Sequence, residues 1–326
     1  MINIDKKCIR SFSMMGTRNV YGLTCLDIAS IDKKMIALSA DMTIYSGLER
    51  FASTFNNRIF NLGIAEQNLI GVASGLSNEG FNVFASTYAA FATTRALDQV
   101  KVNMSYMKIP IKLIGLASGF SQGTFGNTHV SIEDIAIMRS LPNITILSPA
   151  DGLETYKCVM EASKLNFPVY IRLTGVMYSD IVYTEDYNYE IGKSICIKDG
   201  KDIVIIATGS MVYLAKKVSE MLDKDGISAK VVDMHTIKPL DKDVISEAEE
   251  TSKLVVTIEE HNVIGGLGSA VAEVISSNSR VKLLKIGVDD YWPLPGDYKY
   301  QLESVGLTEN NIYNRIKNKY DNLYKI

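Results

Sequence analysis

Short apolar runs alternate with longer amphipathic stretches along the first half of the chain. Strands are expected at residues 35–40, 58–62, 82–86, 109–115, 144–148 and 168–172. Helices are expected at residues 19–30, 65–76, 89–104, around 135–138 and from 151 onward. Strands that alternate with helices of ten or more residues predict a parallel sheet with helices on both faces.

The pattern lapses between about residues 176 and 201, where tyrosines and acidic residues gather, and a second alternation follows. Its strands are expected at 202–209, 229–234, 254–259 and 281–288, and Leu214, Val218, Met221 and Leu222 share one helical face. The sequence therefore predicts an α/β protein with two doubly wound domains and mostly parallel sheets. We place the domains at residues 1–180 and 201–326, with a linker at 181–200.

Composition narrows the classes of partner. Hydrophobic residues make up 47% of the 326 positions, and the formal net charge is −3. This balance is typical of a soluble globular protein and argues against nucleic acid or an anionic membrane as the main partner. The sequence has no apolar run of membrane-spanning length and no signal-peptide core, so a cytoplasmic location is expected. Four cysteines lie far apart, which favours reduced thiols over disulfides or a zinc site.

The first candidate for chemistry is Glu66, which opens a predicted helix after Gly63. An acidic residue at a helix start is often only structural, because the helix N-terminus carries partial positive charge. About twenty residues later, however, an aromatic segment supplies Phe84, Tyr88 and Phe91. A carboxylate that faces a flat, largely apolar pocket could instead bind a heteroaromatic nitrogen base. The residues alone leave both interpretations open.

Several motifs, taken in order, resemble those of the second half of transketolases and of the related 1-deoxyxylulose-5-phosphate synthases. They are Gly63-Ile-Ala-Glu66-Gln-Asn68, Thr128-His129, Leu141-Pro-Asn-Ile144, Ser148-Pro-Ala-Asp151, His235-Thr-Ile-Lys-Pro-Leu-Asp241 and Glu259-Glu-His261-Asn-Val-Ile-Gly-Gly266. The resemblance covers nearly the whole chain, from about Ser11 to Tyr320. It implies a pyrimidine-binding domain followed by a transketolase C-terminal domain of a thiamine-diphosphate enzyme.

The resemblance assigns Glu66 to the pyrimidine ring of thiamine diphosphate. The family glutamate shares a proton with a ring nitrogen and pushes the amino group toward its basic imino form, so that the cofactor can deprotonate its own thiazolium carbon. A dry pocket would favour the protonated carboxyl group needed for this exchange. Tyr88 and Phe91 match the segment that packs on the pyrimidine ring, and Phe84 is a further candidate. Asp41, just past a predicted strand end, matches a family aspartate near the cofactor.

Three further residues match substrate positions of the family. His129 matches the histidine that faces the reacting sugar, where near-neutral titration lets a side chain donate or accept a hydrogen bond. Arg172 and Arg18 match arginines that hold a substrate phosphate, which a planar guanidinium can bind through two hydrogen bonds.

Two second-domain features are expected to be structural. His235 and His261 lie in motifs that indicate interface or loop packing. The glycines of Gly265-Gly266-Leu267-Gly268 open a predicted helix, and tight strand-to-helix packing explains them about as well as a nucleotide site does.

The loop before His129 departs from the family pattern. The family aspartate is replaced by Phe125, a family histidine by Ala117, and the glutamine after the histidine by Val130. Loss of a hydrogen bond to a substrate hydroxyl is worth about 1 kcal/mol or more, enough to redirect substrate preference. We therefore expect a less polar, deoxy, amino or unusually configured sugar, or a different acyl donor.

The resemblance also implies a partner. The family's metal- and diphosphate-binding half has no counterpart in this sequence, so a separate N-terminal transketolase subunit is expected to hold Mg²⁺ or Ca²⁺ and the diphosphate. Active sites would then lie between chains, self-association is expected, and a heterotetramer of two plus two is the natural closed assembly.

These inferences predict a transferase of aldehyde or ketone residues. With its partner, it would move a two-carbon ketol unit from a ketose or ketose phosphate to an aldose. One alternative is acyl transfer from a 2-oxo acid, as in deoxyxylulose-phosphate synthase. Another is a non-catalytic regulatory subunit. The second chain of the decarboxylating component of pyruvate dehydrogenase shares the architecture, but the Thr128-His129 loop argues against that family.

Overall fold

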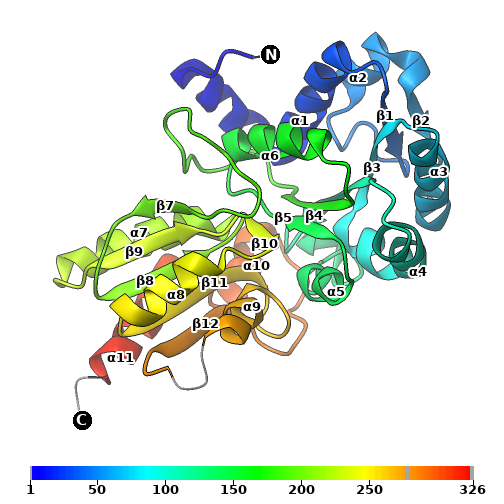
Figure 1. Ribbon diagram of the computed structural model, residues 1–326. Helices are drawn as coiled ribbons and strands as arrows, with labels where there is room; N and C mark the ends of the chain where they lie inside the picture. Colours follow the sequence, from blue (N-terminus) through cyan, green and yellow to red (C-terminus); the bar gives the residue numbers. More distant parts are fainter. Residues whose placement is uncertain (1, 276–278, 324–326) are drawn as a thin grey trace.

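Two separate β-sheets, each flanked by helices, make up the computed structural model, which describes residues 2–275 and 279–323 (Figure 1). In Figure 1 the first sheet and its helices occupy the upper right and the second sheet the lower left. Both sheets are mostly parallel. The predicted fold class is confirmed.

The first sheet has seven strands, and all but the edge strand β10 run parallel to their neighbours. In spatial order they are β10 (Thr236–Lys238), β5 (Thr145–Leu147), β6 (Val169–Thr174), β4 (Lys112–Ser118), β3 (Asn82–Tyr88), β1 (Met35–Ser39) and β2 (Ile59–Asn61). Every residue of β1, β4 and β6 is buried. Continuous apolar strands of this kind are typical of a parallel sheet that is covered on both faces.

The helical segments of the first half are α1 (Lys6–Ile31), α2 (Glu49–Thr54), α3 (Glu66–Asn78), α4 (Leu97–Gln99), α5 (Asp134–Ser140) and α6 (Gly152–Lys164), with the short turns η1 (Asn56–Arg58), η2 (Phe91–Arg95), η3 (Val100–Tyr106) and η4 (Gly123–Phe125). One buried apolar cluster contains residues of α1 and α6, and another contains residues of α3 and α5. The predicted helix at 89–104 is present, but much of it, in η2 and η3, has the wide turns of a π-helix. Such turns are rare and frequent at functional sites.

The second sheet has five strands and is parallel except for its edge strand β7. In spatial order they are β12 (Lys282–Val288), β11 (Leu254–Asn262), β8 (Ile203–Ala207), β9 (Ala229–Asp233) and β7 (Ile195–Lys198). Its helices are α7 (Met211–Lys224), α8 (Lys242–Thr251), α9 (Leu267–Val274), α10 (Tyr298–Ser304) and α11 (Glu309–Asp321). Of the predicted apolar face of α7, Val218 and Leu222 are fully buried.

Helix α1 begins thirteen residues before the predicted start at Asn19, because Lys6 follows the N-cap residue Asp5, whose carboxylate accepts a hydrogen bond from the Cys8 amide. A kink at Gly16, with φ 70° and ψ 163°, separates the two parts of the helix. A Cβ atom at Gly16 would lie 2.5 Å from the carbonyl oxygen of Val176, so the close approach of these two segments requires glycine. The kink interrupts the helical periodicity on which the predicted boundary was based.

The sequence pattern did not indicate two short edge strands, of which one links the halves of the chain. Strand β7 lies inside the predicted linker at 181–200 and pairs with β9 of the second sheet. Strand β10 comes from the second half of the chain but pairs with β5 of the first sheet. The division into domains at 1–180 and 201–326 stays a prediction, and residues 1, 276–278 and 324–326 of those ranges lie outside the described residues.

A buried arginine joins the two sheets. Arg172 in β6 is 3% exposed, and its Nε donates to both carboxylate oxygens of Asp134, at 3.1 and 2.8 Å. Its Nη2 donates to the backbone oxygens of Ser131 (3.4 Å) and Glu260 in β11 (2.9 Å). A substrate phosphate could reach this guanidinium only by displacing these partners. The predicted phosphate contact of Arg172 is therefore replaced by a structural role.

We predict that Asp134→Ala will lower the free energy of unfolding by about 3–5 kcal/mol, because it leaves the Arg172 charge buried without its partner. It also removes the acceptor of the Tyr170 hydroxyl, which lies 2.8 Å from Asp134. Urea unfolding followed by circular dichroism measures the change. Asp243→Ala, which breaks the exposed pair with Lys193, is the control and should leave the midpoint unchanged. Equal effects of the two substitutions would contradict the account.

Candidate active site

The predicted site residues of the first half gather at one edge of the first sheet. Asp41 follows β1, Glu66 comes shortly after β2, Tyr88 ends β3, and His129 lies in the loop after β4. These strands are neighbours and run parallel, so their carboxyl ends meet at the same edge. Open α/β sheets bind ligands at this edge.

Five rings form what we call the aromatic cluster, made of Tyr45, Tyr88, Phe91, Phe125 and His129. The His129 ring lies 5.2 Å from Phe91, 5.4 Å from Phe125 and 5.7 Å from Tyr88, measured between centroids. Tyr88 also contacts Phe91 at 5.8 Å and Tyr45 at 5.3 Å, both edge to face. The predicted residues Tyr88, Phe91, Phe125 and His129 are thus brought together.

Glu66 is the first residue of α3, and although it is only 3% exposed it forms an ion pair with Arg95. Arg95 Nη1 lies 3.0 Å from each carboxylate oxygen of Glu66. The guanidinium of Arg95 also stacks on the ring of Phe91, 3.9 Å from its centroid. Arg95 therefore connects Glu66 to the aromatic cluster. The predicted proton exchange between this carboxyl group and a pyrimidine nitrogen stays a prediction.

Asp41 lies two residues after the end of β1 and has a backbone φ of 59°. Its carboxylate accepts a hydrogen bond of 3.0 Å from the side-chain amide of Asn61, and its own N–H donates to the side-chain oxygen of Asn61. Because that oxygen also accepts from the amide of Gly63, Asn61 links Asp41 to the turn that leads to Glu66. Asp41 remains exposed, so its carboxylate is accessible.

Phe84 lies outside the cluster. It is fully buried in the core, where the ring of Tyr21 lies 6.5 Å away. A ring in this position offers no face to a ligand, so we leave Phe84 out of the site.

The loop that carries His129 exposes an apolar ring at position 125. The Phe125 side chain is 64% exposed and lies against His129. Thr128 Oγ1 lies 3.0 Å from His129 Nδ1, and the His129 amide donates to the Gly126 carbonyl. Ala117 is buried with a φ of 56°, at the point where the pairing of β4 with β6 changes register. Neither Phe125 nor Ala117 has a side chain that can form a hydrogen bond with His129 or a ligand.

Arg18 lies at the far end of the aromatic cluster. Its guanidinium stacks on the Tyr45 ring at 4.2 Å, and its Nη1 donates to the Tyr45 carbonyl oxygen at 3.1 Å. The Nε atom of Arg18 is buried and has no hydrogen-bond partner among the described residues. The predicted substrate contact of Arg18 stays a prediction.

Sequence reasoning missed Tyr45 and Arg95. Tyr45 comes four residues after Asp41, in the loop that leaves β1, and this position at a strand's carboxyl end was a usable signal. Arg95 follows Phe91 by four residues, so the two side chains are neighbours on a helical face. Only the contacts identify Arg95 as the partner of Glu66.

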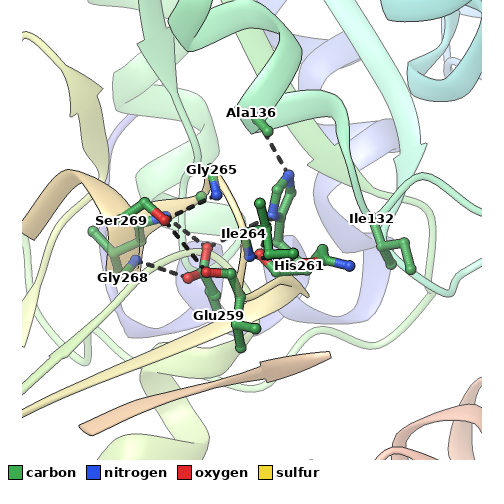
Figure 2. Close-up of polar contacts among 12 residues, drawn as sticks. Ile132, Ala136, Glu259, His261, Ile264, Gly265, Gly268 and Ser269 are labelled. Atoms are coloured by element: carbon green, nitrogen blue, oxygen red, sulfur yellow. Dashed lines mark hydrogen bonds and ion pairs between the residues drawn. The ribbon is translucent and has the colours of Figure 1, made fainter. Parts of the chain in front are cut away.

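Buried hydrogen bonds give Glu259 and His261, at the end of β11, a structural role (Figure 2). The Glu259 carboxylate accepts from the amides of Leu267 (2.6 Å) and Gly268 (2.8 Å) at the start of α9. His261 Nε2 accepts from the amide of Ala136 in α5 at 3.3 Å, so the proton of the neutral ring lies on Nδ1, which donates to the Asn262 carbonyl at 2.7 Å. Since Glu259 occupies the helix start, the glycine cluster serves packing rather than a nucleotide.

Burial shifts the protonation of these groups. It lowers the pKa of His261 to about 4 and, in the same way, the pKa of His235, which packs against Tyr189, to about 4. It raises the pKa of Glu259 to about 7. Both histidines are therefore neutral near pH 7, and their contacts lie outside the aromatic cluster, as expected for structural residues.

The described part of the chain shows neither a metal-binding cluster nor a membrane-spanning helix. Within residues 2–275 and 279–323, no three His, Cys, Asp or Glu side chains gather in a way that could hold a metal ion. In the same residues no helix combines the length and apolar character needed to cross a bilayer.

Two family models match the chain. The model described as "Transketolase, pyrimidine binding domain" matches residues 13–179, and the one described as "Transketolase, C-terminal domain" matches residues 192–312. Together they cover both sheets.

Three relatives align over almost their full lengths. A Methanocaldococcus jannaschii protein named as a putative transketolase C-terminal section is 39% identical, over 92% of this chain and 95% of the relative. One of the subunits of the apulose-4-phosphate transketolase from Phocaeicola vulgatus is 35% identical, over 92% and 96%. A 6-deoxy-6-sulfo-D-fructose transketolase subunit from Clostridium sp. is 36% identical, over 90% and 91%.

A solved structure is also similar to this chain over almost the full length of both. It is described as "Split gene transketolase, inactive beta4 tetramer", is 39% identical, and matches 93% of this chain and 97% of its own with a TM-score of 0.84.

The pKa of His261 generates a prediction for the stability of the fold. Between pH 4 and 6.5 the unfolded chain binds a proton at this residue that the folded chain does not, so stability is lost as the pH falls through this window. We expect His261→Gln to remove up to about 3 kcal/mol of this loss. Urea unfolding of both proteins at pH 7, 6, 5 and 4 measures the difference.

Glu259 acts with the opposite sign, because its raised pKa favours the folded state as the pH falls from about 7, but it is present in both proteins. The comparison therefore reports what changes at His261, including its 3.8 Å approach to Glu259. Parallel stability curves for wild type and variant would show that His261 does not titrate as described.

Proposed function

The chain belongs to the transketolase family, as its motifs predicted, and from this premise we propose that it is the C-terminal subunit of a two-chain transketolase. The proposal is supported by relatives that are named as a C-terminal section or as a subunit and that align from end to end. The reaction we propose is transfer of a two-carbon ketol unit from a ketose or ketose phosphate to an aldose.

The observation that carries the proposal is the position of Glu66, buried at a helix start and connected through Arg95 to the aromatic cluster. These residues fit the pyrimidine half of thiamine diphosphate, on which the family depends. When bound, the cofactor supplies a nucleophilic carbon for the ketose carbonyl. Glu66 would hold the pyrimidine ring nitrogen, and Phe91 and Tyr88 would pack on the ring. Asp41 would contact the cofactor at the same sheet edge.

His129 would act on the sugar. It borders both Phe91 and Tyr88, so a substrate next to the pyrimidine ring lies within its reach. Its imidazole can donate a hydrogen bond to a hydroxyl of the donor sugar or accept one from it, depending on which ring nitrogen carries the proton. Thr128 fixes the ring from the Nδ1 side, which leaves Nε2 for the substrate.

The donor is proposed to be a non-standard sugar. Phe125 presents an exposed apolar ring beside His129, and Ala117 adds no polar group. Two of the relatives are named for apulose 4-phosphate and for 6-deoxy-6-sulfo-D-fructose, which are themselves unusual substrates. Arg18, whose guanidinium lies over the Tyr45 ring at the end of the cluster, would contact an anionic group on the substrate.

We propose that an N-terminal transketolase subunit supplies the diphosphate site and its Mg²⁺ or Ca²⁺. Active sites would form between the two kinds of chain, in a cytoplasmic heterotetramer of two plus two. Self-association of this chain alone is part of the proposal, since the 39% identical split-gene structure is described as an inactive β4 tetramer. Acyl transfer from a 2-oxo acid is the second candidate, because Phe125 stands at the position where the resemblance implies an aspartate that would bind a sugar hydroxyl.

We predict that Glu66→Gln will lower turnover of the reconstituted two-chain enzyme at least about 100-fold, because the amide cannot exchange a proton with the ring nitrogen. Glu79→Gln, at the exposed end of the same helix, is the matched control and should retain full activity. Steady-state kinetics with saturating thiamine diphosphate makes the comparison. Unchanged turnover of the Glu66 variant would leave the chain with a regulatory role only.

A donor screen tests the substrate class. We expect a deoxy, amino or unusually configured ketose to exceed xylulose 5-phosphate in kcat/KM, because Phe125 offers no acceptor for a donor hydroxyl. Phe125→Asp should shift the ratio toward xylulose 5-phosphate about fivefold or more, the value of one hydrogen bond of about 1 kcal/mol. The idea fails if xylulose 5-phosphate is the best donor of the wild-type enzyme by a wide margin. A preference for pyruvate would support acyl transfer instead.

A further inference from the structure

A cavity of about 340 Å³ lies between the end of β6 and three helices of the second half of the chain. Residues 174–180 line one side, and residues of α7, α10 and α11 line the other. Of the described residues that line it, none belongs to the aromatic cluster. Small-molecule sites have volumes of about 300–1,000 Å³. The cavity is therefore a candidate ligand site apart from the candidate active site.

The inner surface of the cavity is largely apolar. Ala150, Met211 and Leu307 are at most 8% exposed and form its floor. The half-buried side chains of Leu214 and Leu302 also line it. An apolar ligand body that enters the cavity is removed from water, and this burial favours binding.

Two of the hydroxyl groups in the cavity wall are already engaged. Ser210 and Tyr298 both donate to the buried carboxylate of Glu260. The hydroxyl oxygen of Ser179, which also lines the cavity, is buried and has no hydrogen-bond partner among the described residues. Ser210 and Tyr298 are therefore unavailable to a ligand, whereas Ser179 can form a hydrogen bond with one.

The rim of the cavity is acidic. Asp180 and Glu309 both line the cavity, and both are exposed. Within the described residues, neither carboxylate forms a hydrogen bond or an ion pair. Partial burial and the charge of Glu309 raise the pKa of Asp180, so the two carboxylates are close enough to repel each other. Two neighbouring carboxylates without a counter-ion are stabilised by a cation placed between them.

The other lining residues also favour a cationic ligand. None of those that the structure describes is Lys, Arg or His. Tyr178 and Tyr213 line the cavity, and the ring of Tyr213 already attracts the ammonium group of Lys217, which lies 5.4 Å from its centroid. An ammonium group at the rim would thus meet carboxylates and tyrosine rings, whereas an anionic group would be repelled.

We propose that this cavity is a binding site for an amphiphilic organic amine, whose ammonium group lies between Asp180 and Glu309 and whose apolar body covers the cavity floor. Ser179 would form one further hydrogen bond with the ligand. The inference goes beyond the proposed function, since it assigns a second site that takes no part in the transferase reaction. Because the two walls come from different halves of the chain, the bound amine would stabilise their contact.

Calorimetric titration of the full chain with three probes of similar shape tests the site. The probes are phenethylamine, 2-phenylethanol and 3-phenylpropionate, which carry a cationic, a neutral and an anionic group on the same phenylethyl body. We expect phenethylamine to bind about fivefold more tightly than 2-phenylethanol, because its charge is paired at an exposed rim. We expect 3-phenylpropionate to bind most weakly of the three.

Variants of the rim and of the interior locate the binding. Asp180→Asn combined with Glu309→Gln should reduce the affinity for phenethylamine to that for 2-phenylethanol. The charge-matched control, Glu185→Gln combined with Glu303→Gln, removes two exposed carboxylates outside the cavity and should retain the preference for the amine. Leu214→Trp fills part of the cavity and should weaken both probes.

The inference is overturned if none of the three probes binds, or if the alcohol or the carboxylate binds as tightly as the amine. It is also overturned if the double variant of the rim keeps the preference of the wild type for the amine. None of these measurements involves turnover, so their outcome is independent of the Glu66→Gln experiment that tests the proposed function.

Discussion

The buried guanidinium of Arg172 is the interaction on which the geometry of the candidate site depends. It joins β6 to Asp134 in α5 and to the Glu260 carbonyl in β11, so both sheets are fixed relative to one another. It also bonds the Ser131 carbonyl, two residues after His129. On the other side of the loop, the Glu260 carboxylate accepts from the Phe120 amide at 2.7 Å. The loop that carries His129 is therefore held at both ends by groups that the second domain helps to place.

The second domain therefore helps to hold the site in place but supplies no residue that contacts the substrate. Glu260 is fully buried and also accepts hydrogen bonds from Ser210 and Tyr298, and Glu259 and His261 on either side accept from the amides of α9 and α5. Three consecutive polar residues thus connect α5, the His129 loop and the second sheet. Since each is satisfied inside the protein, none remains for substrate. These three residues position the His129 loop.

The sequence predicted the alternation of strands and helices well, because buried parallel strands are continuous apolar runs. Its motifs also singled out Glu66, Tyr88, Phe91 and His129, which the structure brings to one sheet edge because the carboxyl ends of neighbouring parallel strands meet there. The sequence pattern did not predict contacts between distant segments of the chain. The Arg95 ion pair, the burial of Phe84 against Tyr21 and the enclosure of Arg172 by Asp134 depend on packing that no local pattern encodes. Short edge strands such as β7 and β10 were missed for the same reason.

The central claim is that this chain holds one half of a thiamine-diphosphate site and that a second chain completes it. Calorimetric titration of thiamine diphosphate with Mg²⁺ tests it most directly, using this chain, the N-terminal transketolase subunit of the same organism, and their mixture. The account predicts tight, saturable binding in the mixture and weak binding to this chain alone, because Glu66 and the aromatic cluster contact only the pyrimidine end. Equally tight binding to the isolated chain would contradict it.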